Sequence, residues 1–276
     1  MEVRYSPDKN GFEMMTMDEL REAFLIDLFA ENSIQLVYSD IDRSICGSSV
    51  PMGEPLELKA SKKEMAADYF LQRRELGVIN IGGQGLITVD GKEYAMDKKD
   101  ALYIGRGSEK IIFQSTSADN PAKFYLLSYP AHTEYPTSHA KFSEAAPLEL
   151  GSAAEANKRT IYKYIYPDGI KSCQLVMGLT ELETGSVWNT MPAHTHQRRS
   201  EIYMYFNLQD NNFVVHLIGE PAETKHLIIR DGQAVLSPSW SLHSGAGTTN
   251  YSFIWGMGGE NQDFDDMDWI PMEDIK

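Results

Sequence analysis

The sequence predicts a mainly β protein with a short helix near its N-terminus, and two observations support this fold class. From about residue 34 onward, the chain is a succession of short segments rich in β-branched and aromatic residues, separated by Gly, Asp or Asn. Before them, residues 17–30 (MDELREAFLIDLFA) carry apolar side chains at helical spacing, with acidic residues near the start. Many short strands joined by regular turns favour an antiparallel sandwich or barrel.

The expected strands fall into two groups, separated by a connector. The first group comprises residues 34–39, 76–81, 85–96, 100–105, 109–115 and 123–130. Asp90-Gly91 divides one of these segments and is typical of a two-residue hairpin turn, since Gly tolerates the positive φ that such turns require. Residues 134–158 are poor in strand signals and contain two prolines and Gly151, so we expect the connector there. The second group comprises residues 160–167, 173–182, 201–208, 211–219, 225–232, 233–238 and 251–258.

A weak internal repeat indicates two barrels of one kind. The tripeptide Gln-Arg-Arg precedes a strand at residues 72–74 and again at residues 197–199. Farther along each half, DALYIGRGSEK resembles QAVLSPSWSLH in its pattern. We therefore divide the chain into a first half, residues 1–140, and a second half, residues 141–276, with one barrel in each.

Charge and cysteine content exclude several classes of protein. The formal net charge of −15 argues against a nucleic-acid partner, whose phosphates need a basic face, and against an anionic membrane surface. No run approaches the ~18 apolar residues of a transmembrane helix, and the N-terminus lacks the basic and then apolar pattern of a signal peptide. Cys46 and Cys173 alone do not describe a disulfide framework. We expect a protein of the reducing cytoplasm that binds neither nucleic acid nor membrane.

A cluster of metal-ligand side chains, His194, His196 and Glu201, stands at the start of an expected strand in HTHQRRSE. On an extended chain His194 and His196 point to the same face, because side chains alternate with period two. His243 follows a proline-marked turn in PSWSLHSG and adds a third imidazole. Three imidazoles and one carboxylate are a common ligand set for a divalent transition metal. We therefore predict one divalent ion, held by these four residues.

The first half lacks this ligand set. A superposition of the repeated segments without gaps places Tyr69, Leu71, Leu76 and Lys110 at the four ligand positions. None of these residue types matches its counterpart, so we expect a metal site in the second half and a structural or lid-forming first half.

The other four histidines fit structural roles better than metal binding. His216 and His226 lie within apolar strand patterns, so we expect them to be strand residues. His132 and His139 lie in PAHTEYPTSHA, which is rich in Pro, Thr and Ser, and we expect them in a loop.

The spacing His-x-His, four residues, Glu, and a later Pro-x(4)-His resembles the two motifs of the cupin superfamily, whose members are double-sheet jelly rolls with a metal inside the barrel. The chain more closely resembles the 5-keto-4-deoxyuronate isomerase family of pectin breakdown. The specific phrases are RRELGVINIGGQGLITVDG, PAHTHQRRSEIYMYF, LSPSWSLHSGAGT and FIWGMGGENQDFDDMD. The likeness extends over nearly the whole chain, including the half without the ligand set.

This resemblance implies a fold of two cupin-like jelly-roll barrels, a bicupin, with a short N-terminal helix. It implies an aldose–ketose isomerase that converts 5-dehydro-4-deoxy-D-glucuronate into 3-deoxy-D-glycero-2,5-hexodiulosonate during pectin and polyuronate degradation. It also implies one zinc ion in each subunit and a homohexamer.

The reaction moves one hydrogen between neighbouring carbons, and a metal that binds the carbonyl and the adjacent hydroxyl acidifies that C–H bond as a Lewis acid. A general acid or base must then reach both carbons. Tyr203 and Tyr205 share strand parity with Glu201, so we expect both to face the lumen, where they either position substrate and transfer protons or simply fill the barrel. Glu201 is a further candidate base if its bond to the metal is labile. The sequence leaves an enediol route and a hydride shift open.

The substrate carboxylate requires a cation in the pocket. Arg199 shares the inward parity of Glu201, whereas Arg198 does not, so Arg199 is the first candidate. Lys163, in TIYKYIYP, is a further candidate from the same half. Trp240, close to the distal histidine, either walls the sugar or belongs to the core.

Two other functions are compatible with the same ligand set. Cupin dioxygenases bind iron through three histidines and one glutamate, so ligand identity cannot exclude a dioxygenase. A bicupin that binds or stores sugar without chemistry is the other alternative, although a complete ligand set argues against it. Metal content and oxygen use during turnover discriminate among the three.

Overall fold

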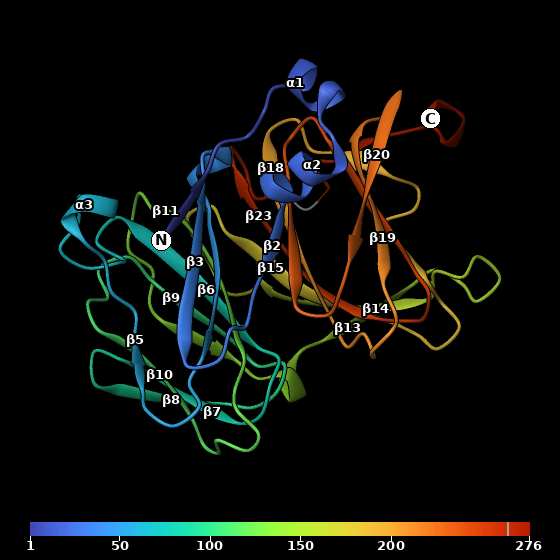
Figure 1. Ribbon diagram of the computed structural model, residues 1–276. Helices are drawn as coiled ribbons and strands as arrows, with labels where there is room; N and C mark the ends of the chain where they lie inside the picture. The colour runs from blue at the N-terminus through green and yellow to red at the C-terminus, as the bar shows by residue number, and fades with distance from the viewer. Residues whose placement is uncertain (264) are drawn as a thin grey trace. The chain divides into compact units, whose positions relative to one another are not determined.

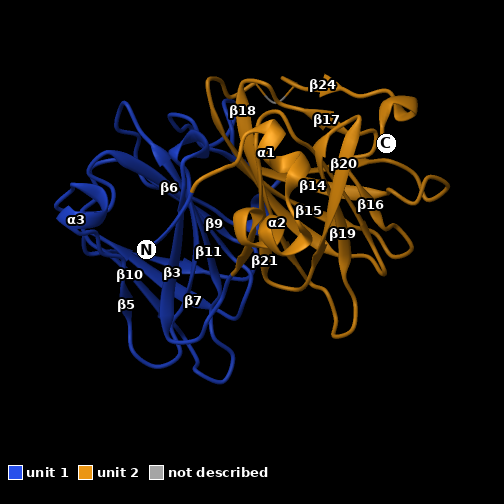
Figure 2. Ribbon diagram, turned by 45° about the horizontal axis from the view of Figure 1, so that its top comes forward, with its two compact units in different colours: residues 1–4, 28–145, 164–176 blue, residues 5–27, 146–163, 177–276 orange. Residues whose placement is uncertain are grey.

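The structure, a computed structural model, describes residues 1–263 and 265–276 and is mainly β (Figure 1). The chain forms two compact units, coloured separately in Figure 2. Unit 1 consists of residues 1–4, 28–145 and 164–176, and unit 2 consists of residues 5–27, 146–163 and 177–276. Each unit contains a seven-stranded and a four-stranded sheet.

Unit 1 is a sandwich with an apolar interior. Its large sheet has the order β1 (Glu2–Arg4), β3 (Ser33–Ser39), β4 (Ile45–Val50), β11 (Phe124–Pro130), β6 (Arg74–Asn80), β9 (Ala101–Ile104) and β12 (Ser138–Ala140). Its small sheet has the order β5 (Leu56–Glu57), β10 (Ile111–Ser115), β7 (Gly85–Val89) and β8 (Lys92–Met96), and the short helix α3 spans Lys62–Met65. Ile87 and Phe113 of the small sheet pack with Leu126 of the large sheet in one core cluster, and each is at most 1% exposed.

Unit 2 has the same plan with additions at its rim. Its large sheet has the order β13 (Pro147–Leu150), β14 (Arg159–Ile165), β15 (Val176–Leu182), β23 (Ser252–Gly259), β18 (Arg199–Phe206), β21 (Gln233–Ser237) and β2 (Leu25–Asp27). Its small sheet has the order β16 (Trp188–Asn189), β22 (Leu242–Gly247), β19 (Val214–Glu220) and β20 (Glu223–Ile229). The helices α1 (Lys9–Met14) and α2 (Met17–Phe24) and a two-stranded ladder, β17 (His194–Thr195) with β24 (Asp268–Trp269), complete it.

The two large sheets repeat each other strand by strand, because β3-β4-β11-β6-β9 and β14-β15-β23-β18-β21 occupy the same places. The register repeats as well. Leu76 of β6 pairs with Ile104, and Glu201 of β18 pairs with Ser237. Leu76 therefore corresponds to Glu201, as the Gln-Arg-Arg segments predict. The mainly β fold with two barrels of one kind is confirmed.

The structure corrects one position of the gapless superposition. Lys110 is exposed and precedes β10, whereas His243 is buried within β22. Phe113 holds the matching ladder position, since it pairs with Ile87 two residues before β7 ends. In the same way His243 pairs with Ile218, two residues before the end of β19. The connection after β9 is longer than the connection after β21. The gapless superposition is therefore displaced by three residues, from Phe113 to Lys110, at the position of His243. Phe113 is likewise no metal ligand.

The predicted helix over residues 17–30 begins as expected and ends early. α2 starts after Thr16, whose hydroxyl accepts a hydrogen bond from the Glu19 amide while the Glu19 carboxylate accepts one from the Thr16 amide. It ends at Phe24, because residues 25–27 form β2 and pair with β21. Pairing with a distant strand overrides the local helical pattern here.

The N-terminal segment, residues 5–27, belongs to unit 2 and not to the contiguous first half. The ammonium group of Lys225 explains part of this placement, since it donates to the backbone carbonyls of Phe12, Glu13 and Met15 where α1 ends. The Phe12 ring also packs edge-on against Trp240, with ring centroids 5.2 Å apart.

Residues 164–176 belong to unit 1, although they follow the expected connector. Glu75, which is fully buried, accepts backbone hydrogen bonds from Cys173, Gln174 and Leu175 at 2.7–2.9 Å. Its Oε2 also accepts a 2.8 Å hydrogen bond from the hydroxyl of Tyr103. One buried carboxylate therefore ties this segment to β6.

Other local expectations differ in detail. The hairpin turn at Asp90-Gly91 is confirmed, with φ of 49° and 86° at the two residues. The expected connector, residues 134–158, contains β12 and β13, so His139 lies in a strand and not in a loop. His216 and His226 lie in strands as expected, in β19 and β20. None of the helices in the described residues is long and apolar enough to cross a membrane.

Candidate metal centre

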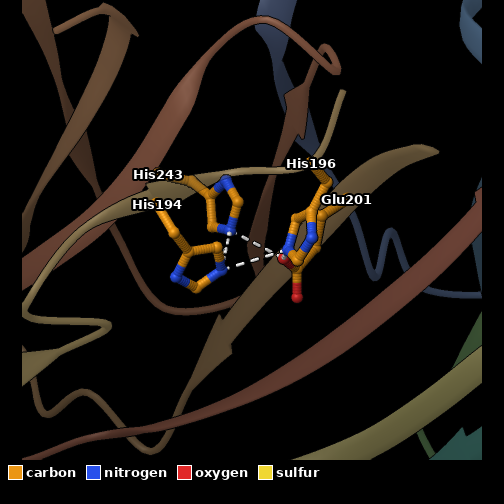
Figure 3. A group of neighbouring side chains, drawn as sticks. All are labelled: His194, His196, Glu201 and His243. Atoms are coloured by element: carbon orange, nitrogen blue, oxygen red, sulfur yellow. Dashed lines mark hydrogen bonds and ion pairs between the residues drawn. The ribbon is translucent and has the colours of Figure 1, made fainter. Parts of the chain in front are cut away.

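The four predicted ligands lie together inside unit 2 (Figure 3). β17 supplies His194, with His196 directly after it, β18 supplies Glu201, and β22 supplies His243. All four side chains are buried, and one ligand atom from each lies within 4.8 Å of the others. The alternation of side chains along an extended segment brings His194 and His196 to one face, and the turn at residues 197–198 then directs Glu201 back towards them.

The four ligand atoms form a closed ring of short contacts. Nε2 of His194 lies 3.0 Å from Nε2 of His196 and 3.2 Å from Nε2 of His243. Oε2 of Glu201 lies 3.1 Å from Nε2 of His196 and 2.7 Å from Nε2 of His243. Tetrahedral donors about 2.0–2.2 Å from a zinc ion lie roughly 3.3–3.6 Å apart, so these four contacts are somewhat shorter than the donor–donor distances of an occupied tetrahedral site.

The protonation states of these side chains suit a metal ion. Nδ1 of His196 lies 2.7 Å from the carbonyl oxygen of Asp266, which can only accept, so Nδ1 carries the proton and Nε2 presents its lone pair. Burial and the neighbouring histidines lower the pKa of His194 to about 2, which keeps this imidazole neutral. Burial alone would raise the pKa of Glu201, but His243 and His196 hold it below its usual range. One cation would satisfy all four donor atoms at once, so the residues fit a divalent metal.

A cavity of about 180 Å³ opens onto three of the ligands: His194, His196 and Glu201. Most of the remaining lining is apolar: Leu150, Ile161, Met191, Pro192, Phe253, Trp255, Met257, Met267 and Trp269. The polar side chains that complete it are Arg159, Thr180, Thr190 and Tyr203. Three imidazole nitrogens and one carboxylate beside such a cavity form a site where a small polar ligand can approach the metal position.

The two candidate tyrosines have different surroundings. Tyr203 lines the cavity, and its hydroxyl lies 2.9 Å from Oγ1 of Thr190. Burial raises its pKa well above the usual value, so the hydroxyl stays protonated. Tyr205 does not line the cavity, and its hydroxyl lies 2.7 Å from Nδ1 of the fully buried His216. Tyr203 can therefore meet a ligand directly, whereas Tyr205 packs behind it.

Arg199 is placed differently from the sequence-based expectation, because its guanidinium does not line the cavity. It is fully buried, donates to the carbonyl of Asp263, and has Nη2 3.4 Å from Nδ1 of His196. The carbonyl of Asp266 lies 3.5 Å from the same Nη2. Parity correctly predicted an inward side chain, but a chain segment near the C-terminus already occupies the space in front of it.

That segment, residues 265–270, is here called the strap. Its Asp268 and Trp269 pair with β17, and the Ile270 amide donates to the carbonyl of Ala193. Arg198 forms ion pairs with Asp266 and Asp268 of the strap. Met267 and Trp269 line the cavity, and the Trp269 ring lies edge-on to His194, with centroids 5.3 Å apart. The strap therefore holds the ligand-bearing strand from outside and forms part of the cavity wall.

The remaining candidates lie outside the cavity lining. Lys163 is half-buried on β14, and Trp240 is half-buried and packs on Phe12, away from the cavity lining. Sequence reasoning missed Arg159, the first residue of β14 and the one arginine or lysine among the described residues that line the cavity. Arg159 and Ile161 both line it, so strand parity could have indicated Arg159.

Comparisons with known proteins agree over the whole chain. A family model described as the KduI/IolB family matches residues 25–272. The chain is 56% identical to the 4-deoxy-L-threo-5-hexosulose-uronate ketol-isomerase of Lachnoclostridium phytofermentans, over the full length of both proteins. It is 51% identical to the protein of the same name from Caldicellulosiruptor bescii, again over the full length of both.

Solved structures support the fold. An IolB-like protein from Salmonella typhimurium matches with a TM-score of 0.70 at 13% identity, and the match covers 90% of this chain and 96% of that chain. Oxalate decarboxylase from Lactobacillus farciminis matches with a TM-score of 0.58 at 10% identity, over 90% of this chain and 88% of that chain. At these identities the likeness shows the fold alone, which is of the cupin type.

Proposed function

The chain belongs to the KduI/IolB family and is a ketol-isomerase, and from this premise we propose that it isomerises 4-deoxy-L-threo-5-hexosulose uronate with a divalent metal held by His194, His196, Glu201 and His243. The observation that carries the metal part is the convergence of these four side chains beside the cavity. The observation that supports the substrate is the shared name of relatives that match over their full length.

The substrate name defines the chemistry that the cavity must serve. A hexosulose uronate of this kind has an aldehyde at C1, a hydroxyl at C2, a ketone at C5 and a carboxylate at C6. Isomerisation moves the C2 hydrogen to C1 and turns the aldehyde into a ketose, 3-deoxy-D-glycero-2,5-hexodiulosonate. The C1–C2 end must therefore lie at the metal ligands, and we place this step in the breakdown of pectin and other polyuronates.

The ligand set also favours a particular metal. Three imidazoles and one carboxylate suit zinc, although other first-row divalent ions accept the same donors. When bound, such an ion supplies a Lewis acid that polarises the carbonyl and the adjacent hydroxyl. Four protein ligands leave room for substrate only if the coordination number expands.

We assign the proton-transfer roles to two side chains of the cavity. Tyr203, held protonated by its burial, donates a hydrogen bond from its hydroxyl to a substrate oxygen. Glu201 is the one carboxylate among the described cavity residues. It contacts the histidines through Oε2, and its other oxygen points away from them (Figure 3), so that oxygen is the candidate acceptor for the C2 proton.

The other candidates have supporting roles in this proposal. Tyr205 positions Tyr203 from behind, since their rings lie 6.1 Å apart and nearly perpendicular. Arg199 holds the carbonyl groups of Asp263 and Asp266 in place beside His196. Lys163 stays a candidate for an electrostatic contribution from β14, outside the cavity lining.

The deciding experiment incubates purified protein with 4-deoxy-L-threo-5-hexosulose uronate and follows the ketose by NMR. We expect conversion without oxygen uptake, loss of conversion after chelation, and recovery with zinc. Oxygen uptake in step with turnover would instead support a dioxygenase. Full activity in metal-free protein would remove the metal from the proposal.

Isotope transfer separates the two chemical routes. If Glu201 takes the C2 proton, turnover in heavy water places deuterium on the product's CH2OH carbon, which was the aldehyde carbon C1 of the substrate, because a carboxyl proton exchanges with solvent. Complete retention of the substrate hydrogen would support a hydride shift and leave Glu201 as a metal ligand alone.

We also propose a homohexamer in the cytoplasm. Leu148, Trp269 and Met272 are large apolar side chains exposed on unit 2, and such groups are commonly covered in oligomers. Light scattering of the eluted protein measures the assembly directly, and a monomer of 31.1 kDa would contradict it.

A further inference from the structure

Arg159 is a cation of the cavity that neither the metal site nor the proton-transfer roles use. It begins β14, is half-buried, and lines the same cavity as His194, His196 and Glu201. Its Nη1 donates one hydrogen bond, of 2.9 Å, to the carbonyl of Asn157. No other hydrogen bond of this guanidinium is formed among the described residues. A guanidinium has five N–H donors, so several stay available to a ligand.

The position of Arg159 in the sheet separates it from the metal ligands. β14 and β18 lie in one sheet with β15 and β23 between them. Neighbouring strands lie about 4.8 Å apart, so the two backbones are roughly 14 Å apart within the sheet. Arg159 and Glu201 both line the cavity, from strands that are three positions apart in this sheet. An elongated ligand can touch both.

The substrate is elongated in the matching way. Its reacting aldehyde is C1 and its carboxylate is C6, at opposite ends of the chain. A carboxylate-binding group must therefore lie away from the metal ligands when C1 and C2 are at them. Arg199 does not meet this requirement, because its Nη2 lies 3.4 Å from His196 and its guanidinium faces Asn261, Asp263 and Asp266.

We propose that Arg159 binds the C6 carboxylate of the substrate and thereby fixes the direction in which the substrate enters the cavity. This inference rests on the proposed substrate. A guanidinium matches a planar carboxylate with two parallel hydrogen bonds, and the surrounding apolar side chains strengthen that interaction by excluding water.

Direction matters because the substrate has two ends that can chelate a metal. The C1 aldehyde with the C2 hydroxyl is the productive pair of oxygens. The C5 ketone with the C6 carboxylate is a second pair, and its negative charge makes it the better ligand for a cation. Arg159 neutralises the carboxylate at the far end of the cavity, so it disfavours the reversed and unproductive orientation.

The test compares the acid with its C6 methyl ester, which has the same length but no charge. For Arg159→Gln we expect kcat/KM to fall about tenfold to a hundredfold on the acid, the usual effect of losing hydrogen bonds to a charged group. On the ester we expect wild type and variant to agree within about threefold. Lys158→Gln is the matched control, because it removes one charge from the adjacent, exposed residue.

The outcomes separate the two proposals. Equal losses on acid and ester would give Arg159 a structural role and overturn this inference, as would an unchanged kcat/KM on the acid. If wild-type protein converts neither compound, the proposed function fails, and the inference fails with it. If Arg159→Gln does not fold, Arg159→Lys keeps the charge but loses the paired hydrogen bonds, and we expect a smaller loss that is again confined to the acid.

Discussion

Two buried glutamates, Glu75 and Glu201, stand one position apart in the internal repeat and have different roles. Glu75 of β6 corresponds to Ser200, and Glu201 of β18 corresponds to Leu76, so the two glutamates lie on opposite faces of equivalent strands. Glu75 faces away from the barrel interior and accepts three backbone N–H groups. Glu201 faces inward and contacts the imidazoles of His196 and His243. A shift of one residue along a strand therefore separates a structural carboxylate from a metal-binding one.

The largest expected effect is at the inward carboxylate of unit 2. Glu201→Leu restores the residue type that unit 1 has at this position, so we expect a folded protein without bound metal. Activity should fall by a factor of about 10³ or more, because the Lewis acid is lost. Elemental analysis and the ketose assay measure the two effects. Lys110→Ala, on the exposed surface of unit 1, is the control and should change neither. Near-stoichiometric metal in Glu201→Leu would remove Glu201 from the ligand set.

The reverse exchange tests the interior of unit 1. Leu76→Glu places a carboxylate among Ile87, Phe113 and Leu126, where no imidazole balances its charge. We expect unfolding to become easier by about 3–5 kcal/mol, the usual effect of an uncompensated buried charge. Urea unfolding followed by circular dichroism measures the change. If Leu76→Glu left the free energy of unfolding unchanged, the interior of unit 1 would have to be polar or hydrated, contrary to its packing.

The outward carboxylate of unit 1 should affect stability but not chemistry. Oε2 of Glu75 accepts hydrogen bonds from the Tyr103 hydroxyl and the Cys173 amide. In Glu75→Gln the side chain is uncharged and one of its oxygens becomes an NH2 group, which cannot accept, so charge-assisted hydrogen bonds are lost. We expect a loss of about 2–3 kcal/mol of unfolding free energy, while kcat/KM at low temperature stays within about threefold of wild type. A tenfold loss of kcat/KM in a protein that is still folded would show that residues 164–176 influence the site in unit 2.

The smallest expected effect concerns the attachment of residues 5–27 to the rest of unit 2. Lys225→Met keeps the aliphatic stem but removes the three hydrogen bonds to the end of α1. We expect unfolding to become easier by about 1–2 kcal/mol, together with faster proteolysis within residues 5–27. Mass spectrometry of the early fragments locates the cuts. Cleavage confined to other regions would mean that β2 alone holds the segment.

The sequence was sufficient for the parts of the site that depend on local geometry. His194 and His196 share a face because strands alternate, and the Gln-Arg-Arg repeat predicted the correspondence of Leu76 with Glu201, which the register confirms. Arg159 was accessible by the same rule, since it shares parity with Ile161, but it stands one residue before the apolar run that marked the strand.

Features that depend on distant partners could not be predicted. Residues 25–27, inside the helix expected over residues 17–30, form a strand because they pair with β21, which no local pattern reveals. Residues 45–50 (ICGSSV) are a fully buried strand without a strong β signal, because small and polar residues dominate it. Arg199 was expected to be free to bind substrate, whereas Asn261 and Asp263, which follow the last long strand without any periodic pattern, contact it.

The pairing of β2 with β21 has a consequence for how the protein is made. Leu25 pairs with Val235, so 210 residues separate the two partners in the chain. At about 5–20 residues per second, the ribosome needs roughly 10–40 s to synthesise that interval. Throughout it, the buried positions Phe12, Phe24 and Ile26 have no barrel to cover them. The apolar N-terminal segment of the nascent chain is therefore exposed either to chaperone binding or to premature self-association. The speed of translation should for this reason influence the yield of native protein.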